Sequence, residues 1–179
     1  MPRLMKSFVL GLLAACAIAI VPSAAAAPVT YPFPSADSTV VGSVGFIDAN
    51  QVGYFWSAAR GDLVSETFAG PTAIYGATLN LEVIENVLAP TAFVDWDVEI
   101  NGVVVGSFTV NSGDFGPFTV NLAFPRITGP MYDVTIRVTN EVAGGDGSHT
   151  LAYDGPYAHS IRLSDIFCPP RGSGPCRIG

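Results

Sequence analysis

Apolar and polar residues alternate strictly along four segments of this chain. Such a period of two places successive side chains on opposite faces of a β-strand, so each segment has one apolar and one polar face. The apolar faces are Ala77, Leu79, Leu81 and Val83; Val94, Trp96, Val98 and Ile100; Phe118, Val120, Leu122 and Phe124; and Tyr132, Val134, Ile136 and Val138. The pattern predicts four half-buried strands.

Shorter apolar runs predict further strands at 40–47, 54–58, 63–68, 149–153 and 160–163, and Gly or Pro separates nearly all of them. Eight to ten short strands at this spacing are typical of an all-β sandwich or jelly roll. One-sided alternation favours antiparallel sheets with one face in water. We therefore predict an antiparallel, jelly-roll-like β-sandwich.

Asn101-Gly102 is the strongest turn signal in the chain. A two-residue loop would pair Ile100 with Val103 and, in a regular ladder, Asp95 with Phe108. A three-residue loop would instead pair Val98 with Val104 and keep the apolar residues of both strands on one face. The sequence favours the three-residue loop, with a positive φ at Gly102.

The N-terminus has the three parts of a secretory signal peptide. Arg3 and Lys6 precede an uncharged apolar run over 7–21, and small residues at 24–26 follow. The run is shorter than the roughly 20 residues of a membrane span. We expect cleavage after Ala26 and secretion or export to the periplasm. The alternative is a lipid anchor at Cys16, which ends a lipobox-like Leu-Ala-Ala-Cys.

The remaining chain is long enough for one domain. We predict an extended Pro-rich leader without a strand over 27–38, a sandwich domain over 39–165 and a Pro/Gly-rich tail over 166–179. Once Arg3 and Lys6 are removed with the signal, six basic and 15 acidic residues remain, which gives a formal net charge of −9. That charge argues against nucleic acid and against anionic membranes as partners.

Two cysteines, Cys168 and Cys176, remain once the signal is removed. Even counts in an exported chain favour a disulfide. The intervening residues are rich in Pro and Gly, so the two ends can meet. The sequence predicts a disulfide that closes a short loop in the tail.

The stretches Val98–Phe108, Phe118–Phe124 and Ile127–Asn140, with the following Gly147-Ser148, resemble the secreted bacterial jelly-roll domains grouped with carbohydrate-binding modules and galactose-binding-like sandwiches. The resemblance lies in the pattern of strands and turns, without a diagnostic motif, and covers less than half the chain. It implies a sandwich fold and assigns no binding residue, since one fold serves many functions.

Catalytic patterns are weak, and we predict a protein that is not an enzyme. The sequence contains two histidines, His149 and His159, but no Gly-x-Ser-x-Gly motif that would supply a serine nucleophile for either of them. Asp95, Asp97 and Glu99 alternate along one predicted strand, where same-face neighbours stand about 6.5–7 Å apart. One calcium ion cannot take all three at its usual ligand distances, so a solvated outer face is the favoured interpretation.

A structural calcium is the one cofactor hypothesis. Residues 141–147 combine flexible Gly carbonyls with two acids, Glu141 and Asp146. The favoured interpretation is an ordinary polar loop, so we expect no cofactor, with a structural calcium as the alternative.

Aromatic residues near polar groups give the leading functional hypothesis, an exported glycan-binding module. The candidate ligand-binding residues are Tyr54, Trp56, Tyr153, Asp154 and Tyr157. Tyr54 and Trp56 share a face if their segment is a strand; burial in the core is the favoured interpretation of this pair, and an exposed sugar-stacking surface is the alternative. A structural or adhesive cell-envelope protein with a protein partner is the second hypothesis, and a secreted hydrolase is the third.

Overall fold

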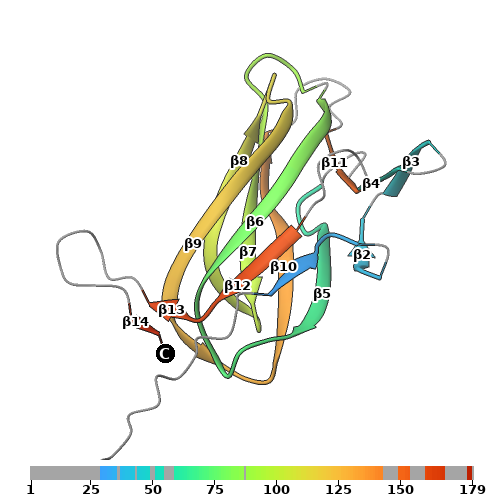
Figure 1. The fold of residues 1–179 in the computed structure, drawn as a ribbon. Coiled ribbons are helices and arrows are strands. Elements are labelled where there is room, and N and C mark those ends of the chain that lie inside the picture. The colour runs from blue at the N-terminus through green and yellow to red at the C-terminus, as the bar shows by residue number, and fades with distance from the viewer. Residues whose placement is uncertain are drawn as a thin grey trace, which may run out of the picture.

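The computed structural model describes residues 29–35, 37–42, 44–48, 51–54, 59–86, 88–142, 149–153, 160–167 and 177–178. These residues form two antiparallel sheets that pack face to face, with the long strands running along the molecule (Figure 1). The prediction of an antiparallel β-sandwich is confirmed. In the described part of the chain, no helix is long and apolar enough to cross a membrane.

The first sheet has five strands in the order β2-β5-β10-β7-β8. Each pair is antiparallel. The strands are β2 (Thr39–Val41), β5 (Leu63–Ala69), β7 (Phe93–Ile100), β8 (Val103–Asn111) and β10 (Met131–Val142). β10 lies in the middle, so its inner face is covered along most of its length.

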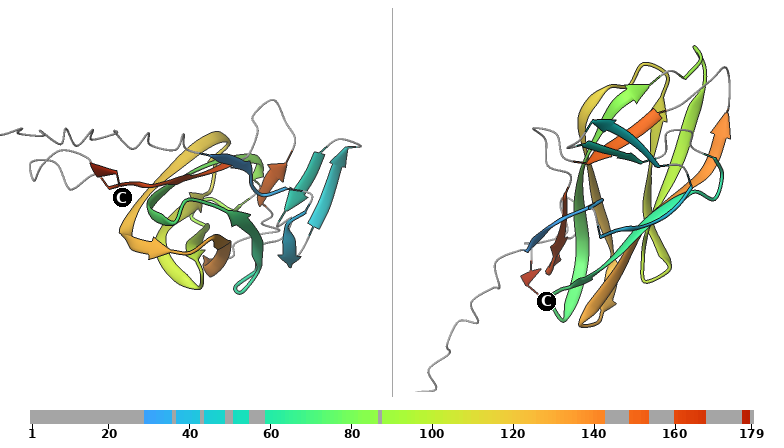
Figure 2. Two further views of the ribbon diagram at one scale, coloured as in Figure 1. Left: turned by 60° about the horizontal axis from the view of Figure 1, so that its bottom comes forward. Right: turned by 90° about the vertical axis from the view of Figure 1, so that its right-hand side faces the viewer.

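The second sheet has seven strands and is built around β6. One edge of β6 pairs with β9, and the other edge pairs with β12 and then with β11. β12 continues to β1, and β11 continues to β4 and β3, which project to one side of the sandwich (Figures 1 and 2). The strands are β1 (Thr30–Pro32), β3 (Val44–Asp48), β4 (Gln51–Tyr54), β6 (Ala73–Asn86), β9 (Gly116–Thr128), β11 (His149–Tyr153) and β12 (Ser160–Ser164).

The core lies between the inner faces of the two sheets. The apolar faces predicted for β6, β7 and β10 are buried throughout, and those of β9 are buried or half-buried. Trp96 stacks on Phe108 of β8 with ring centroids 5.8 Å apart. Burying a large apolar side chain contributes about 1.5–3 kcal/mol, so these periodic residues supply much of the stabilisation.

The register predicted for the β7–β8 hairpin is wrong. The loop has two residues, with φ +52° at Asn101 and +74° at Gly102, and Ile100 pairs with Val103. Both φ values are positive, as in a type I′ turn. A bulge at Val105 then shifts the ladder by one residue, so Val98 pairs with Gly106. The bulge returns Phe108 and Val110 to the inner face, whereas Val103 and Val104, which lie between the turn and the bulge, are exposed.

Residues predicted as a leader without a strand contribute to the sandwich. Thr30–Pro32 form β1, which pairs with β12. Phe33 is fully buried and meets Phe68 edge-on at 5.8 Å between ring centroids. The prediction missed β1 because its short Pro-rich segment shows no alternation.

Two other predicted strands differ in extent. The run 40–47 divides into β2 and β3, which belong to different sheets, with Gly42 at φ +127° between them. The strand predicted at 54–58 is β4, which begins at Gln51 and ends at Tyr54. Residues 55–58 lie outside the described part of the chain.

The tail begins with a small ladder of its own. β13 (Ile166–Phe167) pairs with β14 (Arg177–Ile178), and β13 also lies beside β6. Ile166 pairs with Ile178 and Phe167 with Arg177. Cys168 and Cys176 lie outside the described residues.

Candidate functional site

Two of the predicted aromatic positions lie on neighbouring strands. In the β4–β11 ladder, Leu151 pairs with Tyr54, and Tyr153 lies two residues farther along β11. Positions 54 and 153 are therefore diagonal neighbours in the ladder, although 99 residues of sequence separate them. Trp56, Asp154 and Tyr157 lie outside the described residues.

The predicted calcium ligands are not brought together in the described residues. Glu141 belongs to β10, where its backbone pairs with Val94, and Asp146 lies outside the described part of the chain. Within that part, no three His, Cys, Asp or Glu side chains gather in a way that could hold a metal ion. His149 is the first residue of β11 and pairs with Asn86, whereas His159 is not described.

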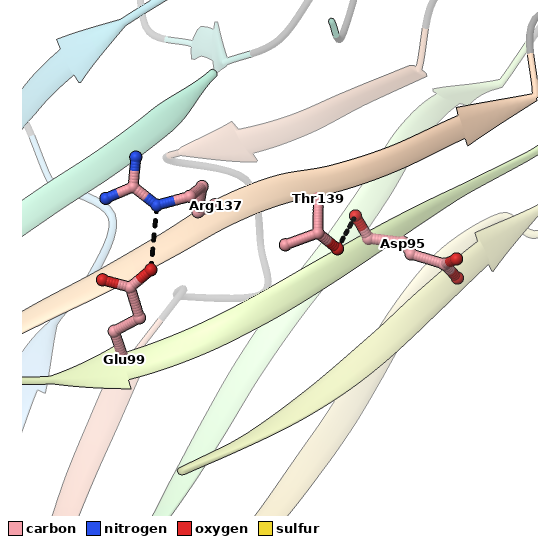
Figure 3. Close-up of polar contacts among 4 residues, drawn as sticks. All are labelled: Asp95, Glu99, Arg137 and Thr139. Atoms are coloured by element: carbon pink, nitrogen blue, oxygen red, sulfur yellow. Dashed lines mark hydrogen bonds and ion pairs between the residues drawn. The ribbon is translucent and has the colours of Figure 1, made fainter. Parts of the chain in front are cut away.

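The acidic row on β7 faces outward, as predicted, but is not simply solvated. Asp95, Asp97 and Glu99 are each half-buried. Arg137 on β10 donates from Nε to Glu99 Oε1 at 2.8 Å, and the Glu99 side chain is only 15% exposed (Figure 3). The pKa of Arg137 is raised because this hydrogen bond favours its charged form.

Asp95 joins three strands through hydrogen bonds. Thr109 Oγ1 on β8 donates to its Oδ1 at 2.6 Å, and Asn140 Nδ2 on β10 donates to its Oδ2 at 3.2 Å. Thr139 Oγ1 donates to its backbone carbonyl at 3.3 Å (Figure 3). The outer face of this sheet is thus a fixed polar network, in which the carboxylates hold protein donors instead of converging on one cation.

A second polar network fixes the loops at one end of the sandwich. Asn86 Nδ2 donates to the carbonyls of Asn111 at 2.7 Å and Asp114 at 2.9 Å. Ser112 Oγ donates to the carbonyl of Leu88 at 2.9 Å. These bonds tie the loop after β6 to the loop between β8 and β9, so the two loops hold each other in place.

A pocket of ≈ 260 Å³ opens beside the β8–β9 loop. Its inner wall includes Val83 and Phe118, and Asp114 and Phe115 belong to its lining. Phe115 is 76% exposed, the highest value among the large apolar side chains described. Sequence analysis missed this pocket, although Asp114-Phe115 between two glycines was a usable signal of a presented aromatic.

The sequence matches no protein-family model, and no curated protein matches it either. Among solved structures, a family 35 carbohydrate-binding module from Clostridium thermocellum is similar, with a TM-score of 0.54 at 13% identity over 78% of this chain and 99% of that one. A CBM36 module in complex with calcium and xylotriose matches with a TM-score of 0.47 at 17% identity, over 78% of this chain and 100% of that one.

An acetyl xylan esterase from the rumen bacterium Butyrivibrio proteoclasticus matches with a TM-score of 0.46 at 13% identity, over 86% of this chain but only 34% of the esterase. The chain has the β-sandwich fold of carbohydrate-binding modules. At these identities the likeness establishes the fold alone, because one fold hosts many functions. The resemblance seen in the sequence is confirmed at that level.

Proposed function

We propose that this protein is an exported, non-catalytic module that binds a glycan. The β4–β11 ladder carries the proposal, because it makes positions 54 and 153 neighbours and so draws two aromatic segments of the sequence together. Similarity to a carbohydrate-binding module over nearly its full length supports it.

The binding chemistry follows from the shape of a sugar ring, which has an apolar C–H face and a rim of hydroxyl groups. Flat aromatic side chains offer a surface for the apolar face. Tyr54, Trp56, Tyr153 and Tyr157 are the proposed aromatic contacts, with Asp154 accepting hydrogen bonds from hydroxyl groups. Connections between strands commonly carry recognition, and Asp154 and Tyr157 lie between β11 and β12 in the sequence.

Export and calcium complete the proposal. Export rests on the three-part N-terminus, with the mature chain starting at Ala27. Glu141 and Asp146 are the proposed acidic ligands of a calcium ion that stabilises their loop; carboxylate and carbonyl oxygens are the donors calcium prefers.

The test uses the secreted protein, whose intact mass gives its N-terminus directly. Binding to insoluble and soluble polysaccharides is measured for wild type, Trp56→Ala and Tyr157→Ala. We expect about a tenfold or larger loss of affinity for each variant, since each removes a large apolar contact. Met131→Ala is the matched control, because Met131 is a 49% exposed apolar side chain on β10.

Binding to no polysaccharide, or binding unaffected by both substitutions, would contradict the proposal and favour a cell-envelope protein. Repeating the measurement and a thermal melt in EGTA tests calcium. A melting temperature unchanged by EGTA would rule out a calcium ion that stabilises the fold.

A further inference from the structure

The pocket beside the β8–β9 loop shares no lining residue with the proposed aromatic site. It opens where edge strands β8 and β9 of the two sheets approach each other. Val83, Val110 and Phe118 form its apolar inner wall, and Thr109, Asp114 and Phe115 belong to the part nearest solvent. The tilted contact between Phe108 and Phe118, with centroids 5.6 Å apart, supports the wall from the core side.

The polar groups of the pocket are held in fixed positions. Asn111 donates to Asp114 Oδ2 twice, from its backbone N at 2.7 Å and from Nδ2 at 3.2 Å. Both bonds end on the same oxygen, so the lone pairs of Oδ1 can accept donors from a ligand. Thr109 is oriented by its 2.6 Å bond to Asp95. Preorganised groups bind with less loss of conformational entropy.

The backbone of the loop presents Phe115 to solvent. Gly113 and Gly116 have φ values of +87° and +90°, a region that favours glycine. The Asn86 hydrogen bonds hold the carbonyls on either side of Gly113. The Phe115 ring, which is 76% exposed on this loop and lines the pocket, offers a flat apolar surface for contact with a ligand.

Charge and size define the ligand. Asp114 is the charged residue among those that line the pocket, and Asp95 stands directly behind Thr109. A carboxylate ligand would be repelled by both acids. Pockets for drug-sized molecules measure about 300–1,000 Å³. At ≈ 260 Å³ this pocket suits one sugar ring and not an oligosaccharide.

We propose that the β8–β9 pocket is a second carbohydrate site, which binds a single neutral sugar unit by contact with Phe115 and by hydroxyl donation to Asp114. Its lining residues are not those proposed for the Tyr54/Trp56 site, so variants of each site test the two proposals independently. A protein with two such sites would hold a polysaccharide by two attachments, which raises its apparent affinity.

The test is NMR titration of the secreted protein with glucose, xylose, mannose and galactose, and with glucuronate as the anionic counterpart. At least one neutral sugar should shift the amide signals of Gly113, Phe115 and Gly116, and glucuronate should bind about tenfold more weakly. The absence of such shifts with all four neutral sugars would overturn the proposal. So would glucuronate binding that equals theirs.

Variants separate this site from a structural effect. Phe115→Ala should weaken binding about tenfold and leave the fold intact, because the side chain is largely in solvent. Phe115→Tyr, which keeps the ring, should bind like wild type, and so should Met131→Ala, which removes an exposed apolar side chain outside the pocket lining. Asp114→Asn should reduce the preference for neutral sugars over glucuronate. An unchanged affinity in Phe115→Ala would contradict the proposal even if Asp114→Asn failed to fold.

Discussion

At the scale of single residues, polar side chains on the outer faces of the sandwich form hydrogen bonds with side chains on neighbouring strands. Glu99 is 15% exposed, and Arg137 donates a hydrogen bond to it across the β7–β10 ladder. On the other sheet, Asn80 accepts from Thr119 at 2.9 Å and donates to Ser160 at 3.0 Å. Each bond spans neighbouring strands, so side chains on the wet faces reinforce the backbone ladders.

Glu82 on β6 lacks such compensation and predicts a pH dependence. Desolvation alone raises its pKa above the usual value of 4.5, so the folded state binds a proton more tightly than the unfolded state. Its ionisation therefore destabilises the fold as pH rises through and above 4.5. Glu82→Gln should melt higher than wild type at pH 7, and the difference should disappear at pH 3.5. Melts by circular dichroism at both pH values measure this, and equal melting temperatures at pH 7 would contradict it.

At the scale of elements, glycines mark where strands bend or approach. A Cβ on Gly76, at the bulge where β6 meets β9, would lie 2.7 Å from the backbone oxygen of Leu122. A Cβ on Gly102, in the β7–β8 turn, would meet nothing within 4 Å. The first glycine is required by close packing and the second only by its positive φ.

These two sites predict different costs of substitution. Gly76→Ala should destabilise the protein by about 1–3 kcal/mol, because the backbone of β9 must move. Gly102→Ala should cost about 1 kcal/mol from backbone conformation alone. Urea unfolding measures both, with Gly102→Asn as the control because Asn tolerates positive φ. Equal costs for Gly102→Ala and Gly102→Asn would show that φ does not decide the effect.

At the scale of the whole molecule, the chain crosses between sheets soon after β1. Glu66 on β5 accepts hydrogen bonds from Ser35 Oγ at 2.8 Å and Ser38 Oγ at 2.7 Å. Tyr31 donates its hydroxyl to the carbonyl of Ala69 and tilts against Phe68 with centroids 4.8 Å apart. The segment 31–38 thereby fastens β1 of one sheet to β5 of the other.

The tail predicts a local disulfide. Phe167 pairs with Arg177, and these are the residues next to Cys168 and Cys176 in the sequence. Opposed Cα atoms in antiparallel strands are about 4.5–5.5 Å apart, within the range for disulfides. Reduction should add about 2 Da to the intact mass. It should also remove roughly 2.5 kcal/mol of stabilisation from loop closure, and this loss should be confined to the tail.

The melting temperature of the sandwich should therefore change little when the disulfide is reduced. A Cys168→Ser, Cys176→Ser double variant is the control and should melt like the reduced protein. Free thiols in the untreated protein would show that the bond is not formed. A large fall in melting temperature would show that the disulfide supports the core as well as the tail.

Local sequence patterns were enough to predict the inner faces of the long central strands. Tyr132, Val134, Ile136 and Val138 are all buried, as their alternation predicts, because strand geometry couples each side chain's face to its position in the chain. The positive φ at Gly102 was also readable, since Asn-Gly is a local turn signal. The fold class followed from these local patterns together.

Only the tertiary structure decided which strands pair and which side chains meet. The bulge at Val105, the strand at Thr30–Pro32 and the pocket under Phe115 depend on partners distant in sequence. The alternation of apolar and polar residues does not predict which strands pair, because the backbone hydrogen bonds of one strand can be satisfied by many different neighbours. The choice is made by packing the two apolar faces against each other, and that choice also positions the aromatic and acidic groups of the proposed sites.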